Sequence, residues 1–322
     1  MSPMSPMDRP TGSAARFLLP YPPSQIGGLP GGLPVAVWDG TGAAPGIESL
    51  AAVEFFVIPY TFADVAAPLM PRLPQLRVVQ SLSAGVEGLH QHVPTGAVLC
   101  NAGGVHDAST SELAVTLILA SLRGLPGFIR NQDTAEWTGG FRPALADRTV
   151  LLVGYGSIAS AIEARLTPFE CDVLRVARTA RDAPRGPVHP IAELPELLPR
   201  ADVVVLTVPL TPQTRGMADA DFLARMRDGT LLVNVSRGPV VDTGALLAEL
   251  GAGRLSAALD VTDPEPLPAG HPLWHAPNTL ITPHIGGTTS AFLPRALRLV
   301  RAQLLRYLKG EPLENIVTPP TP

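Results

Sequence analysis

The stretch that decides the fold is residues 149–159, TVLLVGYGSIA. Its apolar residues 150–153 predict a short buried strand, and the residues after Ala159 predict a helix. Gly154, Gly156 and Ala159 stand between them in a G-x-G-x-x-A pattern. The first glycine permits a sharp turn, the second lets backbone approach a pyrophosphate, and the third small residue lets the helix pack close to the strand. Because a pyrophosphate would rest on the helix N-terminus, this context predicts a dinucleotide site, with an ordinary glycine turn as the alternative.

Downstream of this stretch, short apolar segments alternate with segments of helical pattern. Strands are expected at 149–153, 173–177, 202–207, 230–235, 256–261 and 279–282. Helices are expected at 221–226, 243–250 and 292–309. This alternation is typical of a doubly wound α/β domain with a parallel sheet.

The residues upstream predict a second, smaller α/β domain. Its strand-length apolar segments are 35–38, 55–58, 76–80 and 97–100. Residues 111–122 predict a helix that is apolar nearly all round and therefore buried, with residues 107–111 able to cap it. Residues 130–142 are polar around Trp137, so a loop or an arm is expected there.

Composition limits the class of protein. At 322 residues the chain is long enough for two domains, and 46% hydrophobic with 16% charged residues indicates a globular protein. A net charge of −4 gives no reason to expect nucleic acid or an anionic membrane as a partner. The longest apolar stretch, 113–122, is too short to span a bilayer, and no signal peptide is visible. The two cysteines, Cys100 and Cys171, cannot form a disulfide framework, which favours a reduced, cytoplasmic setting; Cys171 is interpreted as a structural thiol, with a redox sensor as the alternative.

Polar residues follow the last three expected strands where each one ends. Ser236 and Arg237 follow the fourth strand of the larger domain, Asp260 closes the fifth with Glu265 five residues on, and His284 follows the sixth. Ligands of open α/β sheets bind beyond the carboxyl ends of the strands. We therefore expect these side chains to converge at the nicotinamide end of a bound dinucleotide.

This set of side chains suits hydride transfer to a carbonyl next to a carboxylate. Arg237 can hold a carboxylate with two parallel hydrogen bonds and polarise the carbonyl. His284 as an imidazolium can donate the balancing proton, and a neighbouring carboxylate raises its pKa. Taken singly, Arg237 could form a surface ion pair, His284 could be a loop histidine and Asp260 could be a cap.

The end of the second strand bears on which dinucleotide binds. The acid that would bind a ribose hydroxyl belongs there, about 20 residues after the glycines, but the strand closes on Ala177. Arg178, Thr179 and Arg181 follow, and can receive a 2′-phosphate. The pattern favours NADP over NAD; a solvated loop is the alternative.

These motifs together resemble the D-2-hydroxyacid dehydrogenase family, of the NAD(P)-dependent glyoxylate/hydroxypyruvate reductase type. The resemblance covers about residues 76–315 and is carried by SAGVEGL, NAGGVHDASTSELA, VGYGSIA, VPLTPQTRGM, LVNVSRGPVVD, AALDVTDPEPL and TPHIGG. It implies reduction of a small 2-oxo acid to the D-2-hydroxy acid. Glu265 argues against the formate dehydrogenase branch, where a glutamine stands beside the histidine.

The resemblance also implies roles for individual residues. Arg237 would bind substrate, Glu265 would pair with the histidine, and His284 would donate the proton. The backbone at Ala84 and Gly85 would hold the substrate carboxylate. Cofactor contacts would come from Thr110, Gly154, Tyr155, Gly156, Ser157, Ile158, Arg178, Thr179, Val208, Pro209, Thr214, Val235, Ser236, Asp260, His284 and Gly286, and no metal is expected.

The domain organisation that the resemblance implies is a cofactor domain inserted into a flavodoxin-like substrate domain. We expect a disordered tail at 1–14, a substrate domain at 15–103 and 290–322, and a cofactor domain at 104–289 with a dimerisation arm near 123–143. A homodimer follows from that arm. Two other functions stay open: a corepressor-like protein that senses the dinucleotide, and a phosphoglycerate-type dehydrogenase.

Overall fold

The computed structural model describes residues 14–317, which divide into two compact units. The larger unit contains residues 106–292, and the smaller one combines the chain before it with the chain after it. The tail expected at residues 1–14 lies, apart from Ala14, outside the described residues.

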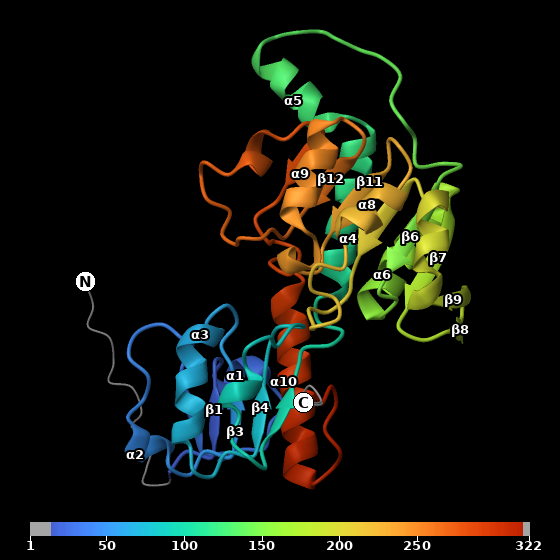
Figure 1. Ribbon diagram of the computed structural model, residues 1–322. Helices are drawn as coiled ribbons and strands as arrows, with labels where there is room; N and C mark the ends of the chain where they lie inside the picture. The colour runs from blue at the N-terminus through green and yellow to red at the C-terminus, as the bar shows by residue number, and fades with distance from the viewer. Residues whose placement is uncertain (1–13, 318–322) are drawn as a thin grey trace. The chain divides into compact units, whose positions relative to one another are not determined.

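The larger unit is built on a sheet of eight strands in the order β13-β12-β11-β10-β6-β7-β9-β8 (Figure 1). Every neighbouring pair is parallel except β8 and β9, which form an antiparallel hairpin. The strands are β6 (Thr149–Val153), β7 (Asp172–Ala177), β8 (Arg181–Ala183), β9 (Gly186–Pro190), β10 (Val203–Leu206), β11 (Leu231–Asn234), β12 (Ser256–Leu259) and β13 (Thr279–Ile281). The order reverses beside β6, so the glycine-rich turn leaves the sheet at its topological switch point.

Helices cover both faces of this sheet. The covering helices are α4 (Asp107–Leu122), α6 (Ser157–Leu166), α7 (Leu194–Leu197), α8 (Ala220–Arg225) and α9 (Thr243–Gly251), whereas α5 (Leu125–Asp133) follows α4 and has no buried residue. Successive side chains of a strand point to opposite faces, so Val150 and Leu152 pack with α4 and α6, while Leu151 and Val153 pack with α8 and α9. Burial on both faces explains why β6 reads as a continuous apolar run.

The smaller unit has a five-stranded parallel sheet in the order β2-β1-β3-β4-β5 (Figure 1). Its strands are β1 (Phe17–Leu19), β2 (Val35–Val37), β3 (Phe55–Val57), β4 (Val78–Gln80) and β5 (Val98–Cys100). Its short helices are α1 (Pro23–Ile26), α2 (Ile47–Leu50) and α3 (Ala63–Ala66). The predicted fold class, a doubly wound cofactor domain with a flavodoxin-like α/β domain, is confirmed by this topology.

The C-terminal part of the chain completes the smaller unit. Helix α10 (Phe292–Lys309) places Tyr307 against Phe17 and Phe55, with ring centroids 6.3 and 5.4 Å apart. On the same helix, buried Gln303 donates to the Gln80 side chain at 2.8 Å and to the carbonyl of Glu314 at 2.9 Å. These bonds tie the end of the chain to β4.

Some local predictions differ from the structure. The helix expected at 111–122 begins at Asp107, and its first turn is not capped by a side chain; Ser109 and Thr110 instead bond to residues 289 and 286. A loop or an arm was expected from residue 130, but residues 125–133 form a helix; the arm near 123–143 stays a prediction. Strand β1 and the β8–β9 hairpin went unpredicted because they are short and flanked by proline, glycine or charged residues.

Among residues 14–317, no single helix is long and apolar enough to cross a membrane. The adjoining helices α4 and α5 pass a length and composition test only as a pair, and the chain bends by 67° between them.

Candidate active site

The glycine-rich turn after β6 is shaped by close approach of the neighbouring loop. Gly154 has a φ of +99°, and a Cβ there would lie 2.7 Å from both the backbone nitrogen and Cγ1 of Val208. Only glycine fits this position, because backbone cannot move aside as a flexible side chain can.

The next glycine leaves open space where a ligand can bind. Gly156 is the N-cap of α6, makes no side-chain cap, and a Cβ there would meet no atom within 4 Å. Ser157 and Ile158 form the first turn of that helix, and Ala159 is fully buried against the sheet. Free N–H groups beside open space at a helix N-terminus fit a pyrophosphate, so these residues can hold a dinucleotide.

The loop after β7 lies beside this turn. Ala177 ends the strand, and Arg178 and Thr179 are exposed directly after it. Arg181, at the start of β8, donates a hydrogen bond to the backbone carbonyl of Tyr155 within the glycine-rich turn. One arginine of this loop is therefore already fixed beside the turn.

In the loop after β10, the Thr214 side chain bonds to the backbone of the loop itself. The Thr214 hydroxyl donates to the carbonyl of Pro209 at 2.6 Å and accepts from the Thr211 amide at 2.8 Å. Thr214 thus stabilises the loop that carries Val208 and Pro209, and its hydroxyl is occupied within that loop.

The turn after β11 fixes Arg237. The amide of Asn234 accepts from the Ser236 backbone at 3.0 Å and donates to the carbonyl of Arg237 at 3.0 Å. Ser236 and the preceding Val235 are buried. A Cβ on Gly238 would lie 1.8 Å from the carbonyl oxygen of Thr262, so this turn is pressed against the segment that leads to Glu265.

His284 and Glu265 form an ion pair in which His284 Nδ1 lies 2.5 Å from Glu265 Oε1. The hydrogen bond with Glu265 raises the pKa of His284, and desolvation opposes this only in part. The same bond lowers the pKa of Glu265. Arg237 lies near enough for its charge to act on both groups. Between the two pKa values, the pair holds a protonated imidazole beside a carboxylate.

Asp260 organises the loop that carries His284. It is only 3% exposed. Its Oδ1 accepts from the Thr282 hydroxyl at 2.6 Å and from the Ile285 amide at 2.9 Å, and its Oδ2 accepts from the Gly286 amide at 2.9 Å. His284 itself has a φ of +53°, a conformation that a non-glycine residue keeps only where its surroundings impose it. The Thr110 hydroxyl adds a bond to the carbonyl of Gly286 at 3.3 Å.

The structure therefore brings together, in the larger unit, the residues that the sequence analysis placed at the strand ends. Arg237, Glu265, His284 and Asp260 are neighbours at the carboxyl edge of the sheet. The carboxylate-binding role of Ala84 and Gly85 stays a prediction: both lie half-buried on the loop after β4 of the smaller unit.

Two residues of this site were missed by the sequence analysis. Asn234 shapes the turn of Arg237, and Thr282 binds the Asp260 carboxylate. Their only signal is a polar residue in or directly after an apolar strand, since a polar group removed from water needs a partner. Within the described part of the chain, no group of three or more His, Cys, Asp or Glu could hold a metal ion.

Fold and site together define an oxidoreductase that binds a nicotinamide dinucleotide. The chain belongs to the D-isomer specific 2-hydroxyacid dehydrogenases: the model of that family's NAD binding domain matches residues 115–286. This match confirms the predicted family and the NAD(P)-dependent enzyme class.

Similar proteins include reductases and dehydrogenases that act on 2-hydroxy acids or 2-oxo acids by their names. Glyoxylate reductase/hydroxypyruvate reductase of Homo sapiens is 36% identical over 253 residues, which cover 74% of this chain and 76% of that protein. The structure of a D-isomer specific 2-hydroxyacid dehydrogenase from Xanthobacter autotrophicus Py2, in complex with NADPH and MES, matches with a TM-score of 0.79 at 28% identity and covers 95% of this chain and 98% of that one. The NADPH-dependent glyoxylate/hydroxypyruvate reductase of Sinorhizobium meliloti, in complex with NADP and sulfate, matches with a TM-score of 0.79 at 25% identity and covers 94% and 98%.

Proposed function

We propose that the protein reduces a small 2-oxo acid of the glyoxylate or hydroxypyruvate type to the D-2-hydroxy acid, with NADPH preferred over NADH. The observation that carries this proposal is the His284–Glu265 ion pair beside Arg237 at the carboxyl edge of a dinucleotide-binding sheet. The similar reductases from Homo sapiens and Sinorhizobium meliloti support the substrate class.

The chemistry divides between the cofactor and the chain. When bound, the reduced nicotinamide supplies the hydride. Arg237 orients the substrate carboxylate and polarises the carbonyl. His284 is held through Nδ1 by Glu265, which leaves Nε2 to donate the proton to the carbonyl oxygen. Glu265 keeps the imidazole protonated until that transfer.

The preference for NADPH is supported by the end of β7. Ala177 offers no carboxylate to a ribose hydroxyl, and Arg178 and Thr179 are exposed beside it. Arginine side chains accommodate a 2′-phosphate, whereas an acid at this position would repel it.

The experiment compares initial rates of NADPH and NADH oxidation with glyoxylate, hydroxypyruvate, pyruvate and phenylpyruvate. We expect turnover with the small 2-oxo acids, a higher kcat/KM for NADPH, and a loss of about 10²–10⁴-fold in kcat in His284→Asn, the usual contribution of a general acid. The matched control is His189→Asn, because His189 also pairs with a glutamate, Glu193, at 2.7 Å and is expected to keep wild-type turnover. A preference for NADH would overturn the cofactor assignment, and no turnover with any pair would overturn the reductase.

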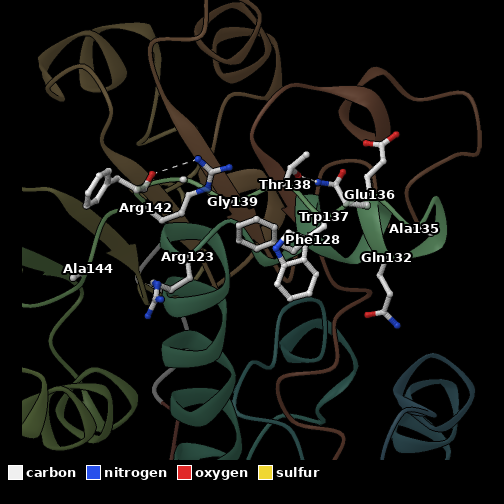
Figure 2. Close-up of a pocket in the computed structure, with 13 residues that line it drawn as sticks. Arg123, Phe128, Gln132, Ala135, Glu136, Trp137, Thr138, Gly139, Arg142 and Ala144 are labelled. Carbon is white, nitrogen blue, oxygen red and sulfur yellow. Dashed lines mark hydrogen bonds between the residues drawn. The ribbon is translucent and has the colours of Figure 1, made fainter.

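We further propose a homodimer formed through the arm, in the cytoplasm. The arm carries Trp137 and Phe141 fully exposed, at 103% and 106%. Trp137 and Arg142 line an open pocket of about 950 Å³ formed by α5 and the loop that follows it (Figure 2). The Arg142 guanidinium lies over the Phe128 ring, 5.3 Å from the ring centroid. A second copy of this chain can bury these apolar groups by two-fold self-association.

Sedimentation velocity tests the dimer. Wild type is expected to sediment as a dimer and Trp137→Ser/Phe141→Ser as a monomer, whereas a double variant that stays dimeric would refute the arm as the interface.

The cytoplasmic setting is supported by the two thiols, which are free in the structure. Burial raises the pKa of both, that of Cys100 to about 11, so neither is poised as a reactive thiolate.

A further inference from the structure

A buried acid lies beneath the glycine-rich turn and is not used by the chemistry above. Glu163, on α6, is only 3% exposed. Arg175 of β7 donates to its Oε1 through both Nε, at 2.9 Å, and Nη2. The hydroxyl of Tyr155, the residue between the two glycines of the turn, donates to its Oε2. Both carboxylate oxygens are therefore occupied.

The same three side chains connect to the β8–β9 hairpin. Gly186, which begins β9, has a φ of +132°, and a Cβ there would lie 3.0 Å from Arg175 Nη1. The hairpin thus packs on the Arg175 guanidinium. From β8, Arg181 reaches back and donates to the Tyr155 carbonyl. Tyr155 is held at both ends, its hydroxyl by Glu163 and its carbonyl by Arg181.

A buried ion pair is costly to desolvate, and well-packed apolar residues of similar volume are often as stable. The added stability of Glu163, Arg175 and Tyr155 is therefore a weak explanation for their presence beneath the turn. Positioning of Arg181 explains them better, because Arg181 lies beside the turn where the adenosine ribose of a dinucleotide binds. The single bond to Tyr155 leaves other N–H groups of that guanidinium available for a phosphate.

We propose that Glu163, Arg175 and Tyr155 are positioning residues that hold Arg181 against the glycine-rich turn, where it binds the 2′-phosphate of NADP. This inference rests on the proposed NADPH preference and adds which residues position the arginine that produces it. Both arginines are exposed, but Arg181 is fixed by its hydrogen bond to the Tyr155 carbonyl, so it supplies a positioned donor.

The test measures binding of adenosine 2′,5′-bisphosphate and of AMP to the full-length protein by calorimetry. Arg181→Ala is expected to weaken bisphosphate binding by about tenfold or more, as for loss of a charge-assisted contact, and AMP binding much less. Tyr155→Phe removes one hydrogen bond and is expected to weaken bisphosphate binding by about threefold to tenfold. Because Tyr155 acts through Arg181, adding Tyr155→Phe to Arg181→Ala should cause no further loss.

A matched control exists in the smaller unit. The Tyr307 hydroxyl donates at 2.7 Å to Glu54, which also pairs with Arg16 at 2.7 Å, so Tyr307→Phe breaks the same kind of contact elsewhere. It is expected to leave the ratio of bisphosphate to AMP affinity unchanged. Glu163→Gln serves as a second variant, with the same selective loss expected, and thermal melts verify that each variant is folded.

The outcomes separate this inference from the proposed function. Equal affinity of the wild type for bisphosphate and AMP would overturn the NADPH preference and this inference with it. A wild-type preference for bisphosphate combined with additive losses in the double variant would overturn the positioning role alone. If Tyr155→Phe weakened the binding of bisphosphate and of AMP equally, the positioning role would also be overturned, because Tyr155 would then have a general structural role.

Discussion

Replacing Asp260 by asparagine tests whether this carboxylate organises the loop of His284 before any ligand binds. The carboxylate accepts three hydrogen bonds, from Thr282, Ile285 and Gly286. An asparagine of the same shape has one oxygen. If that oxygen keeps Thr282 and Ile285, its NH₂ group faces the Gly286 N–H, donor against donor.

The magnitude follows from those contacts. One hydrogen bond to a charged group is lost and one buried N–H is left without a partner, each costing about 1.5 kcal/mol, so the free energy of unfolding should fall by about 3 kcal/mol. For a unit of this size, about 2–4 °C per kcal/mol gives a Tm lower by about 6–12 °C. The kcat of the proposed 2-oxo acid reduction should fall as well, because the loop no longer fixes His284 against Glu265.

The assay is thermal unfolding of the cofactor-free protein, followed by steady-state kinetics. Asp228→Asn is the matched control: the Asp228 side chain is 86% exposed, and its variant should stay within about 0.5 kcal/mol of wild type. An unchanged Tm for Asp260→Asn in the cofactor-free protein, with only the KM for the cofactor raised, would refute the loop-organising role and leave Asp260 as a cofactor contact.

Two further predictions concern the proton donor and the glycines. Glu265→Gln removes the carboxylate that raises the pKa of His284, so the fall of the reduction rate with rising pH should move to lower pH; a pH profile of kcat identical to wild type would contradict this. Gly154→Ala should destabilise the fold by about 2 kcal/mol or more, because its Cβ meets Val208 backbone at a positive φ, whereas Gly156→Ala should keep the wild-type Tm and weaken NADPH binding. Melting curves with fluorescence titrations measure both, and equal Tm losses in the two variants would contradict the distinction.

Much of the fold could be predicted from the sequence because the patterns that specify it lie within short segments. The apolar run of β6 and the glycines after it specify a strand, a turn and a helix within a few residues. Arg237, Glu265 and His284 could be proposed because a parallel sheet brings the carboxyl ends of its strands to one edge. Residues that follow different strands can therefore be predicted to lie close together in space.

Other features were unreadable because their partners are distant in the chain. The first turn of α4 is helical because residues 286 and 289 satisfy Thr110 and Ser109. Capping preferences alone place such residues outside a helix. The spacing between the glycines and the end of β7 also does not predict that Arg181 donates a hydrogen bond to the Tyr155 carbonyl.

The sequence by itself determined the class of fold, the dinucleotide turn and the residues proposed to move the proton, because periodicity, glycine and strand-end chemistry are properties of short segments. Only the tertiary structure decided which polar groups hold those residues in place. Asp260 beneath the His284 loop and Glu163 beneath the glycine-rich turn are both buried and bonded to residues on other elements. The physical reason is that a buried polar group must find its hydrogen-bond partner in space, and the folded chain alone defines which group that is.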